Sequence, residues 1–230
     1  HFALIMENFL KGLLILHIIG GTVALLSGLI AIFTKKGGKI HRLSGKFYFG
    51  GMTAVFISAI ALSIGHHKPF LLMVGFFSYY MVIRGYRALY LKNLGREQKP
   101  AALDWAIVLI AGAFIIYLLC WGIVFIVWGV GMGIVAVVFG VLGCLFLRND
   151  LNKLIRGPKE KMHWWYTHIG GMGGGYVATL TAFVVVNIEL KPGWVLWLIP
   201  SAIGVPIILV TIGRYKRRFS ATGSGLRTGS

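Results

Sequence analysis

Two histidines in the chain are each followed by glycines within otherwise apolar sequence. His17 precedes Gly20 and Gly21 in LHIIGG, and His168 precedes Gly171 in THIGG. Residues three or four positions apart share one face of a helix, so each imidazole and its glycine would lie side by side. A haem iron takes axial imidazole ligands, and small residues one turn away leave room for the macrocycle. These five residues are therefore candidate cofactor-binding residues, and the cofactor they suggest is haem b or a transition metal ion.

The same two patterns have a structural interpretation, which the sequence leaves open. Small residues let membrane helices approach closely, so the glycines are also typical of helix–helix contacts. His17 is the deepest ionisable group, about nine residues into the first apolar stretch, roughly 13 Å of helical rise. An ionisable residue at that depth is a functional candidate, but a neutral imidazole that hydrogen bonds across helices is the alternative.

A second set of candidate ligands lies where apolar stretches begin. His41 precedes the second stretch, Asp104 begins the fourth, and His163 and His168 begin the sixth. If the helices form one bundle, these side chains lie at a similar membrane depth. Imidazole and carboxylate groups are ligands for transition metals. These four residues are therefore candidate metal ligands, and His41 is also a candidate cofactor ligand.

Helix geometry limits how these residues can combine. His163 and His168 are five positions apart, which is a rotation of about 140° and a rise of about 7.5 Å. We expect them to face different neighbours, so that a metal site needs a ligand from another helix, and His41 could pair with either. Asp104 has an alternative role in an ion pair with Arg84 or Arg87. His17 and His168 differ in depth by roughly 15 Å on the predicted boundaries, too far for one haem to be held by both.

The composition indicates that membrane helices position these residues. Of the 230 residues 57% are apolar, and the mean hydropathy is +0.82. Soluble domains contain roughly 45–50% apolar residues. The net charge of +17 comes from short basic blocks between apolar stretches. That distribution is typical of the loops of an integral membrane protein and argues against nucleic-acid binding.

The sequence predicts an all-α, polytopic transmembrane helical bundle. A spanning helix needs roughly 20 apolar residues. Only the Trp128–Gly131 turn separates the fourth and fifth stretches, so six spans are the alternative to seven. The seven predicted spans are Phe9–Phe33, Phe47–Gly65, Phe70–Leu91, Trp105–Ile126, Val130–Leu147, Trp164–Val186 and Trp194–Gly213.

Loop charges predict the orientation of this bundle. Twenty of the 23 Lys and Arg residues fall in four blocks, at 34–46, 84–99, 148–161 and from 214 onward. By the positive-inside rule these blocks are cytoplasmic, so seven spans place the N-terminus outside and the C-terminus inside. We expect the protein in the bacterial inner (cytoplasmic) membrane, in contact with lipids.

Acidic residues are few and lie at or beyond the ends of the predicted spans. They are Glu7, Glu97, Asp104, Asp150, Glu160 and Glu189. Transporters coupled to protons or sodium often carry a carboxylate within the membrane, so this distribution argues against that class.

The predicted spans make one domain with a short segment at each end. Residues 9–213 form the single transmembrane domain. Residues 1–8 form an N-terminal segment, in which MENFLKG is typical of a natural start, so that the preceding HFALI is either a remnant of cloning or the product of an earlier start site. Residues 214–230 form a basic cytoplasmic tail with a linker-like end, ATGSGLRTGS.

Two long stretches resemble a known family. LHIIGGTVALLSGLIAIFTKKGGKIHRLSGKFYFGGM and HWWYTHIGGMGGGYVATLTAFVVVN resemble an uncharacterised family of bacterial predicted multi-pass membrane proteins, a domain of unknown function. The resemblance covers most of the chain and implies architecture but no activity. The first stretch is also loosely similar to small b-type cytochromes, although such proteins usually show clearly paired histidines on facing helices. The matching residues are His17, Gly20, His41, Arg42, Gly45, His168, Gly170, Gly171, Met172, Thr181, Ala182 and Phe183.

Three functional hypotheses follow from these observations. The first is a membrane protein with a histidine-ligated cofactor or metal, acting in redox chemistry or electron transfer. The second is a small transporter, channel or lipid-interacting protein without a cofactor. The third is an accessory subunit of a membrane complex, with partner membrane subunits or further copies of itself around it.

Overall fold

Seven α-helices and one short 3-10 helix make up the described part of the chain. The computed structural model describes residues 2–224, with side chains from residue 4 to 220, and it contains no strand in that range. The helices are α1 (Phe2–Phe33), α2 (Lys39–Gly65), α3 (Pro69–Arg87), η1 (Ala88–Tyr90), α4 (Ala102–Val127), α5 (Met132–Arg156), α6 (His163–Asn187) and α7 (Val195–Ser224).

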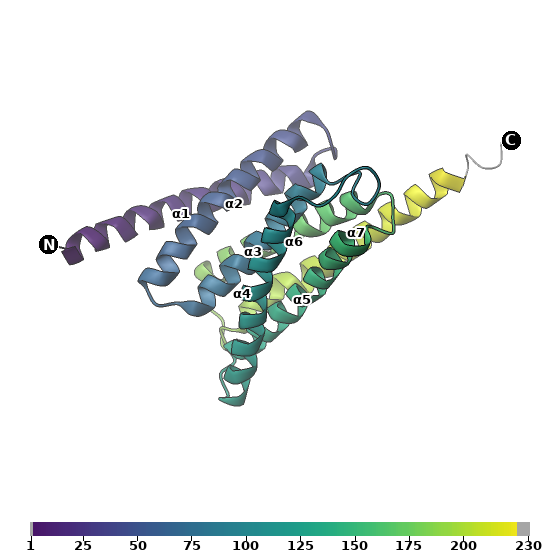
Figure 1. The fold of residues 1–230 in the computed structure, drawn as a ribbon. Helices are drawn as coiled ribbons and strands as arrows, with labels where there is room; N and C mark the ends of the chain where they lie inside the picture. Colours follow the sequence, from purple (N-terminus) through teal and green to yellow (C-terminus); the bar gives the residue numbers. More distant parts are fainter. Residues whose placement is uncertain (1, 225–230) are drawn as a thin grey trace.

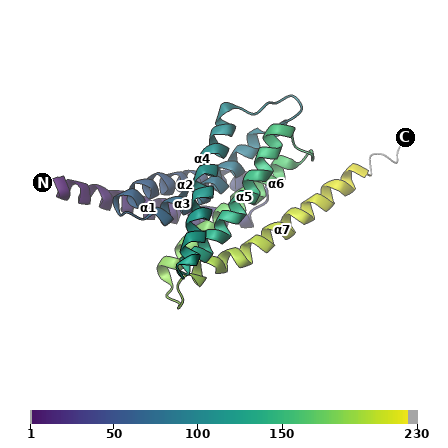
Figure 2. The ribbon, with the colours of Figure 1, turned by 60° about the horizontal axis from the view of Figure 1, so that its bottom comes forward.

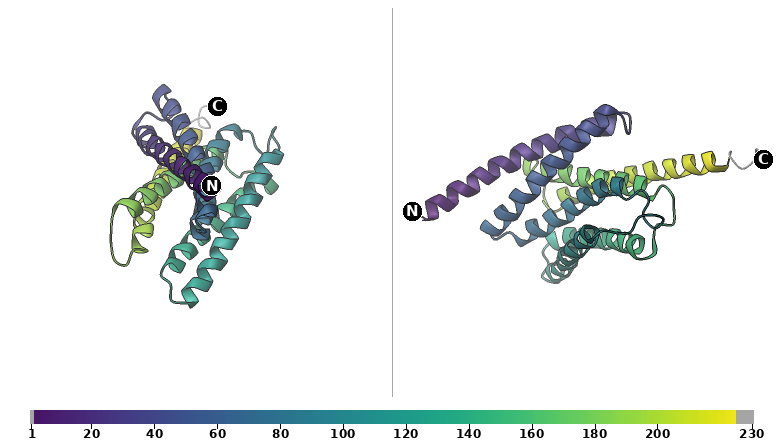
Figure 3. Two further views of the ribbon diagram at one scale, coloured as in Figure 1. Left: turned by 90° about the vertical axis from the view of Figure 1, so that its left-hand side faces the viewer. Right: turned by 45° about the horizontal axis from the view of Figure 1, so that its top comes forward.

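The helix α3 lies at the centre of three antiparallel helix pairs. The pairs are α1–α2, α4–α5 and α6–α7. The helix α3 contacts α2 of the first pair, α4 and α5 of the second, and α6 of the third. In the end view the three pairs point in different directions around the centre (Figure 3, left). The purple start of α1 and the yellow end of α7 extend beyond the rest of the bundle on opposite sides (Figures 1 and 2).

Glycines allow the closest of these helix contacts. A Cβ atom at Gly51 of α2 would lie 2.7 Å from the carbonyl oxygen of Gly20 in α1. A Cβ atom at Gly171 of α6 would lie 2.6 Å from the Cα of Gly85 in α3. Neither position can hold a side chain without moving the helices apart. Gly20 and Gly171 thus lie at close helix–helix contacts, which was one of their two interpretations from the sequence. At these glycines the space that a haem macrocycle would need is filled by the neighbouring backbone.

The outer surface of the bundle suits a lipid environment. Six helices are long and apolar enough to cross a membrane, and α3 is the seventh helix. Every 18-residue window of α3 includes Arg84, which lowers its mean hydropathy. Because α3 is enclosed by the other helices, its polar groups contact protein instead of lipid. The predicted all-α membrane bundle is confirmed, while the orientation and the exact number of spans stay predictions.

Several helices extend further than the apolar stretches that predicted them, whereas α3 ends at Arg87 and not at the predicted Leu91. The helix α2 begins at Lys39 instead of Phe47, and α5 continues to Arg156 instead of ending at Leu147. Charged residues are good helix formers, so a helix continues past the point where its sequence stops being apolar. The extensions gather at one end of the bundle, with the connections 34–38, 88–101 and 157–162, which we call the basic end. The tail from residue 225 lies outside the described residues.

Candidate functional site

The structure brings His41 and His168 together at the basic end. His41 lies in the first turn of α2 and His168 lies near the start of α6. Their ring centroids are 6.3 Å apart, with an angle of 76° between the ring planes. The sequence left open whether His41 would approach His163 or His168, and the structure selects His168. We call these two residues the histidine pair.

Backbone carbonyl groups fix which nitrogen of each ring carries a hydrogen. The Nδ1 atom of His41 lies 3.0 Å from the carbonyl oxygen of Ala31, and that of His168 lies 2.9 Å from the carbonyl oxygen of Gly85. A carbonyl oxygen only accepts, so each Nδ1 must carry the hydrogen. In a neutral imidazole the other nitrogen, Nε2, then has a free lone pair. Within the described residues neither Nε2 atom makes a hydrogen bond.

Close packing of α3 and α6 sets the position of His168. Gly171 follows His168 by three residues and therefore lies on the same face of α6. That face meets α3 at Gly85, whose carbonyl oxygen accepts the His168 hydrogen bond. The glycine beside this histidine thus positions the imidazole through the helix contact.

A tight turn and the end of α1 set the position of His41. Gly37 has a φ of +76°, a conformation that favours glycine, and it lets the chain reverse between α1 and α2. Lys36 donates hydrogen bonds from Nζ to the carbonyl oxygens of Ala31 and Ile32 in the last turn of α1. Burial lowers the pKa of Lys36 from its ordinary value. His41 shares the Ala31 carbonyl with this lysine, so the turn and the imidazole are held together.

The four predicted metal ligands do not form one site. Within residues 2–224 no group of three or more His, Cys, Asp or Glu side chains could hold a metal ion. Asp104 faces Arg87, whose Nε and Nη2 atoms lie 2.7 and 3.2 Å from its carboxylate oxygens. It also accepts a hydrogen bond of 2.8 Å from the Ala101 backbone at the start of α4. The predicted ion pair of Asp104 is confirmed, with Arg87 as its partner.

His163 lies apart from the histidine pair. Its side chain is 7% exposed, and its buried Nε2 atom has no hydrogen-bond partner in the described structure. It is one of the residues that line a cavity beside Arg84, Lys153 and Thr167, while His168 faces α3 and α2. The rotation of about 140° over five helical residues accounts for this separation.

His17 forms a hydrogen bond between helices. Its Nδ1 atom lies 3.0 Å from the Ser58 hydroxyl of α2. The same hydroxyl donates to the carbonyl oxygens of Ala54 and Val55, so it accepts from the imidazole. His17 therefore has the structural bond that was the alternative to a ligand role. A Cβ atom at neighbouring Gly21 would lie 3.9 Å from Val55, an ordinary contact.

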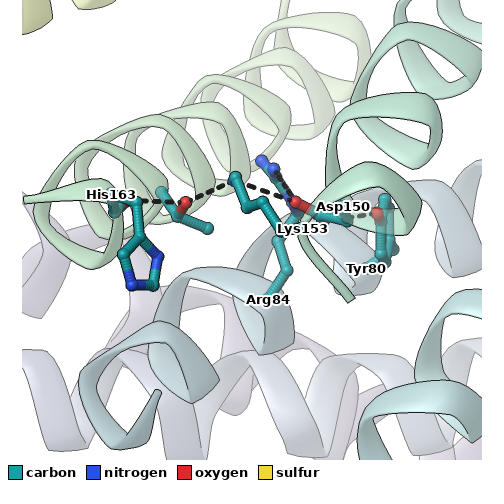
Figure 4. A network of polar contacts seen from close by, with 6 residues as sticks. Tyr80, Arg84, Asp150, Lys153 and His163 are labelled. Atoms are coloured by element: carbon teal, nitrogen blue, oxygen red, sulfur yellow. Dashed lines mark hydrogen bonds and ion pairs between the residues drawn. The ribbon is translucent and has the colours of Figure 1, made fainter. Parts of the chain in front are cut away.

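A buried ionic network at the basic end was not predicted. The Nε and Nη2 atoms of Arg84 lie 2.6 and 2.7 Å from the two carboxylate oxygens of Asp150 (Figure 4). The Tyr80 hydroxyl donates to the same carboxylate over 2.7 Å, and Lys153 approaches it to 3.2 Å. We call these residues, with Thr167, the Arg84–Asp150 network. The sequence interpretation placed Asp150 beyond the fifth span, whereas α5 carries it into the protein interior.

Comparison with known proteins identifies no relative of the chain. No protein-family model, no curated protein and no solved structure matches the chain. This result is consistent with the uncharacterised family that the sequence resembles. The fold defines the class as a polytopic α-helical membrane protein, and its polar side chains concentrate at the basic end.

Proposed function

We propose that the protein is a membrane component that binds one redox-active metal centre, haem b iron or a transition metal ion, between His41 and His168. The observation that carries the proposal is the pair of Nε2 lone pairs left free by the two Nδ1 hydrogen bonds. When bound, the metal centre would supply one-electron chemistry, and the chain would hold and orient it.

The separation of the two rings suits a shared metal. With metal–nitrogen distances of about 2.0–2.1 Å, two imidazoles on one metal have ring centroids roughly 5–6.5 Å apart, the larger value for ligands on opposite sides. The observed separation of 6.3 Å lies within this range. His41 and His168 would then be the residues that hold the metal ion or a haem iron, since imidazole is a usual ligand for both.

The hydrogen bonds behind the rings also support a ligand role. A histidine that ligates a metal usually donates its other ring N–H to a carbonyl or carboxylate, which fixes its orientation. Both histidines have such a carbonyl, and each carbonyl belongs to a neighbouring helix: Ala31 in α1 for His41, and Gly85 in α3 for His168. The pair is thus supported by four helices, α1, α2, α3 and α6.

The charge around the pair favours haem over a bare divalent ion. Lys36 lies close enough to affect His168 electrostatically, and five Lys or Arg residues fall within 34–46. Cations beside a site disfavour a bare metal ion and favour a cofactor with acidic groups, such as the propionates of haem. Ile40, Leu43 and Phe47 on α2 are exposed, so the flank near His41 also offers apolar surface.

This site belongs at the cytoplasmic side if the positive-inside rule holds for the chain. The protein would then sit in the bacterial inner membrane and exchange electrons with a partner near that surface. The test of location uses a reporter enzyme that is active only in the cytoplasm, fused after α7. We expect this fusion to be active.

Absorption spectroscopy of the purified protein tests the proposal. Protein from cells with ample haem should show a Soret band that sharpens and shifts when dithionite is added. His41→Ala and His168→Ala should lose the band, while His66→Ala, a matched change in the exposed turn after α2, should keep it.

Metal analysis of the same samples separates the two forms of the proposal. If there is no Soret band, a transition metal that is bound by the native protein and lost from both pair variants identifies a metal ion site. If native protein holds neither haem nor a metal that depends on His41 and His168, the proposal is wrong.

The exposed surface of α7 favours a second candidate role, that of an accessory subunit in a larger membrane complex. Only 6% of its apolar membrane-spanning stretch is buried, since it packs mainly on α6, with Trp197 near its start contacting Phe70 of α3. Such a surface contacts lipid or a partner membrane subunit. Purification from native membranes in a mild detergent tests this role, because a subunit would bring a partner in fixed ratio and a solitary protein would not.

A further inference from the structure

A cavity lies beside the Arg84–Asp150 network, outside the histidine pair. It has a volume of about 50 Å³ and is bounded by residues of α3, α4, α5, α6 and the segment after α3. A water molecule needs roughly 10–15 Å³ of such volume, so the cavity has room for a small polar group. Arg84, Arg87, Lys153 and His163 line it together with Asp104 and Asp150.

The two carboxylates of the cavity have little capacity left to accept hydrogen bonds. Each oxygen of Asp150 has two donors: Tyr80 and Arg84 on Oδ2, and Arg84 and Lys153 on Oδ1. Asp104 accepts from both Nε and Nη2 of Arg87 and from the backbone of Ala101. A carboxylate has about four acceptor positions, so Asp150 is saturated and Asp104 nearly so.

The donors of the cavity are not used up. Lys153 carries three N–H groups, of which two have partners, Asp150 and the Thr167 hydroxyl at 2.7 Å. The ion pairs of both arginines use Nε and Nη2 and do not involve Nη1. The buried Nε2 of His163 also has no partner among the described residues, but its ring points away from the Lys153–Thr167 contact, so we do not count it among these donors (Figure 4).

The charge of the cavity has the same sign as its unused donors. Three cationic side chains face two carboxylates, and Arg96 adds a further positive charge close to His163. A group that fills this space must therefore accept hydrogen bonds and carry negative charge. A metal cation fits neither requirement, because the two carboxylates have almost no acceptor capacity left for it.

We infer that this cavity binds an anionic phosphate group, held by Lys153 and the free arginine nitrogens. Phosphate oxygens accept several charge-assisted hydrogen bonds, and arginine and lysine are their usual partners. The apolar part of the lining, which includes Leu91, Ile107 and Leu154, suits the start of a lipid chain. The phosphate can come from an acidic lipid headgroup or from solution, and both sources present the same chemistry.

Thermal unfolding of the purified protein in detergent tests this site. The probes are inorganic phosphate, phosphatidylglycerol and, as an uncharged comparison, phosphatidylcholine. A ligand that binds only the folded state raises the unfolding midpoint, and above Kd this stabilisation grows with the logarithm of the ligand concentration. We expect phosphate or phosphatidylglycerol to raise the midpoint, and Lys153→Gln to weaken this binding roughly 10- to 100-fold, since it removes a charged hydrogen bond.

A matched variant separates specific binding from general salt effects. Arg156→Gln removes the same charge one turn further along α5, where the side chain is exposed, so it should respond like the native protein. A second variant, Leu154→Phe, keeps every charge and fills the cavity, so it should lose the response as Lys153→Gln does.

The outcomes distinguish the sources and can overturn the inference. A midpoint raised only by phosphatidylglycerol identifies a lipid site, and one raised by phosphate alone identifies a soluble anion. Equal responses in the native protein, Lys153→Gln and Arg156→Gln would show that phosphate acts only as a salt. No response to either anion in the native protein contradicts the inference, whatever the histidine pair binds.

Discussion

The histidine pair and the Arg84–Asp150 network lie at the same end of the bundle but have opposite hydrogen-bonding capacity. In the histidine pair, backbone carbonyls take up the ring N–H groups and leave two lone pairs free. In the network, the Asp150 carboxylate is saturated and N–H groups of Arg84 and Lys153 are left over. Free lone pairs suit a metal, and free donors suit an anion. Both proposed ligands therefore rest on the unused hydrogen-bonding capacity of each cluster, which differs more clearly than its residue types do.

Removal of the Asp150 carboxylate should produce the largest effect on stability. Asp150→Ala leaves the guanidinium of buried Arg84 without its partner. An unpaired buried charge costs about 3–5 kcal/mol. The measurement is the unfolding midpoint in detergent, which should fall strongly. Tyr80→Phe, which removes only one hydrogen bond to the same carboxylate, should lower it far less, and an equal loss in both variants would contradict the ionic role.

A side chain at Gly171 should disturb the histidine pair without touching it. Gly171→Ala forces α6 away from Gly85 and so weakens the His168 hydrogen bond to that residue. Overpacking of this kind costs about 1–3 kcal/mol. Cofactor content and unfolding midpoint should both fall.

The neighbouring glycine provides the control for this prediction. A Cβ atom at Gly170 would lie 3.7 Å from Ile212, an ordinary contact, so Gly170→Ala should leave both quantities unchanged. If the two variants behave alike, the close approach of α3 and α6 does not set the position of His168.

Replacement of His17 should sharpen the distinction between a ligand and a structural histidine. His17→Ala removes one hydrogen bond to Ser58, which contributes about 1 kcal/mol. We expect a small drop in the unfolding midpoint and no change in haem or metal content. A loss of cofactor in this variant would show that His17 is a ligand and would contradict the proposal that His41 and His168 alone hold the cofactor.

The smallest effect is expected at the exposed ion pair of Lys216 and Glu160. Their nitrogen and oxygen atoms lie 2.6 Å apart, but both side chains are about half exposed. Such pairs contribute roughly 0–1 kcal/mol. Glu160→Gln should lower the unfolding midpoint only slightly, and this small decrease should disappear in high salt. A large effect would show that the link between α7 and the segment before α6 stabilises the bundle.

Sequence reasoning predicted features that depend on one helix at a time. Apolar stretches located all seven helices, and the five-residue spacing separated His163 from His168. The Asp104–Arg87 pair was anticipated because both residues end neighbouring helices at one depth. Helix ends were missed where charged residues continue the helix, as at Lys39 and Arg156.

Features that depend on the rotation of two helices against each other were not predictable. The pairing of His41 with His168 needs α2 and α6 to face each other, although α1 and α3 provide most of their backbone contacts. The Arg84–Asp150 pair joins residues 66 positions apart, and nothing in either local sequence identifies the other. The one available signal was Lys153, which follows Asp150 by three residues and so lies on the same helix face.

The separation of Arg84 from Asp150 along the chain also has a consequence for biogenesis. The helix α3 is synthesised with its arginine, but the matching carboxylate arrives only with α5, 66 residues later. A charged side chain is costly inside a membrane until it finds a partner. A nascent chain that ends after α4 therefore still has a guanidinium without its carboxylate partner, and we expect α3 to settle into the bundle only when α5 has followed it.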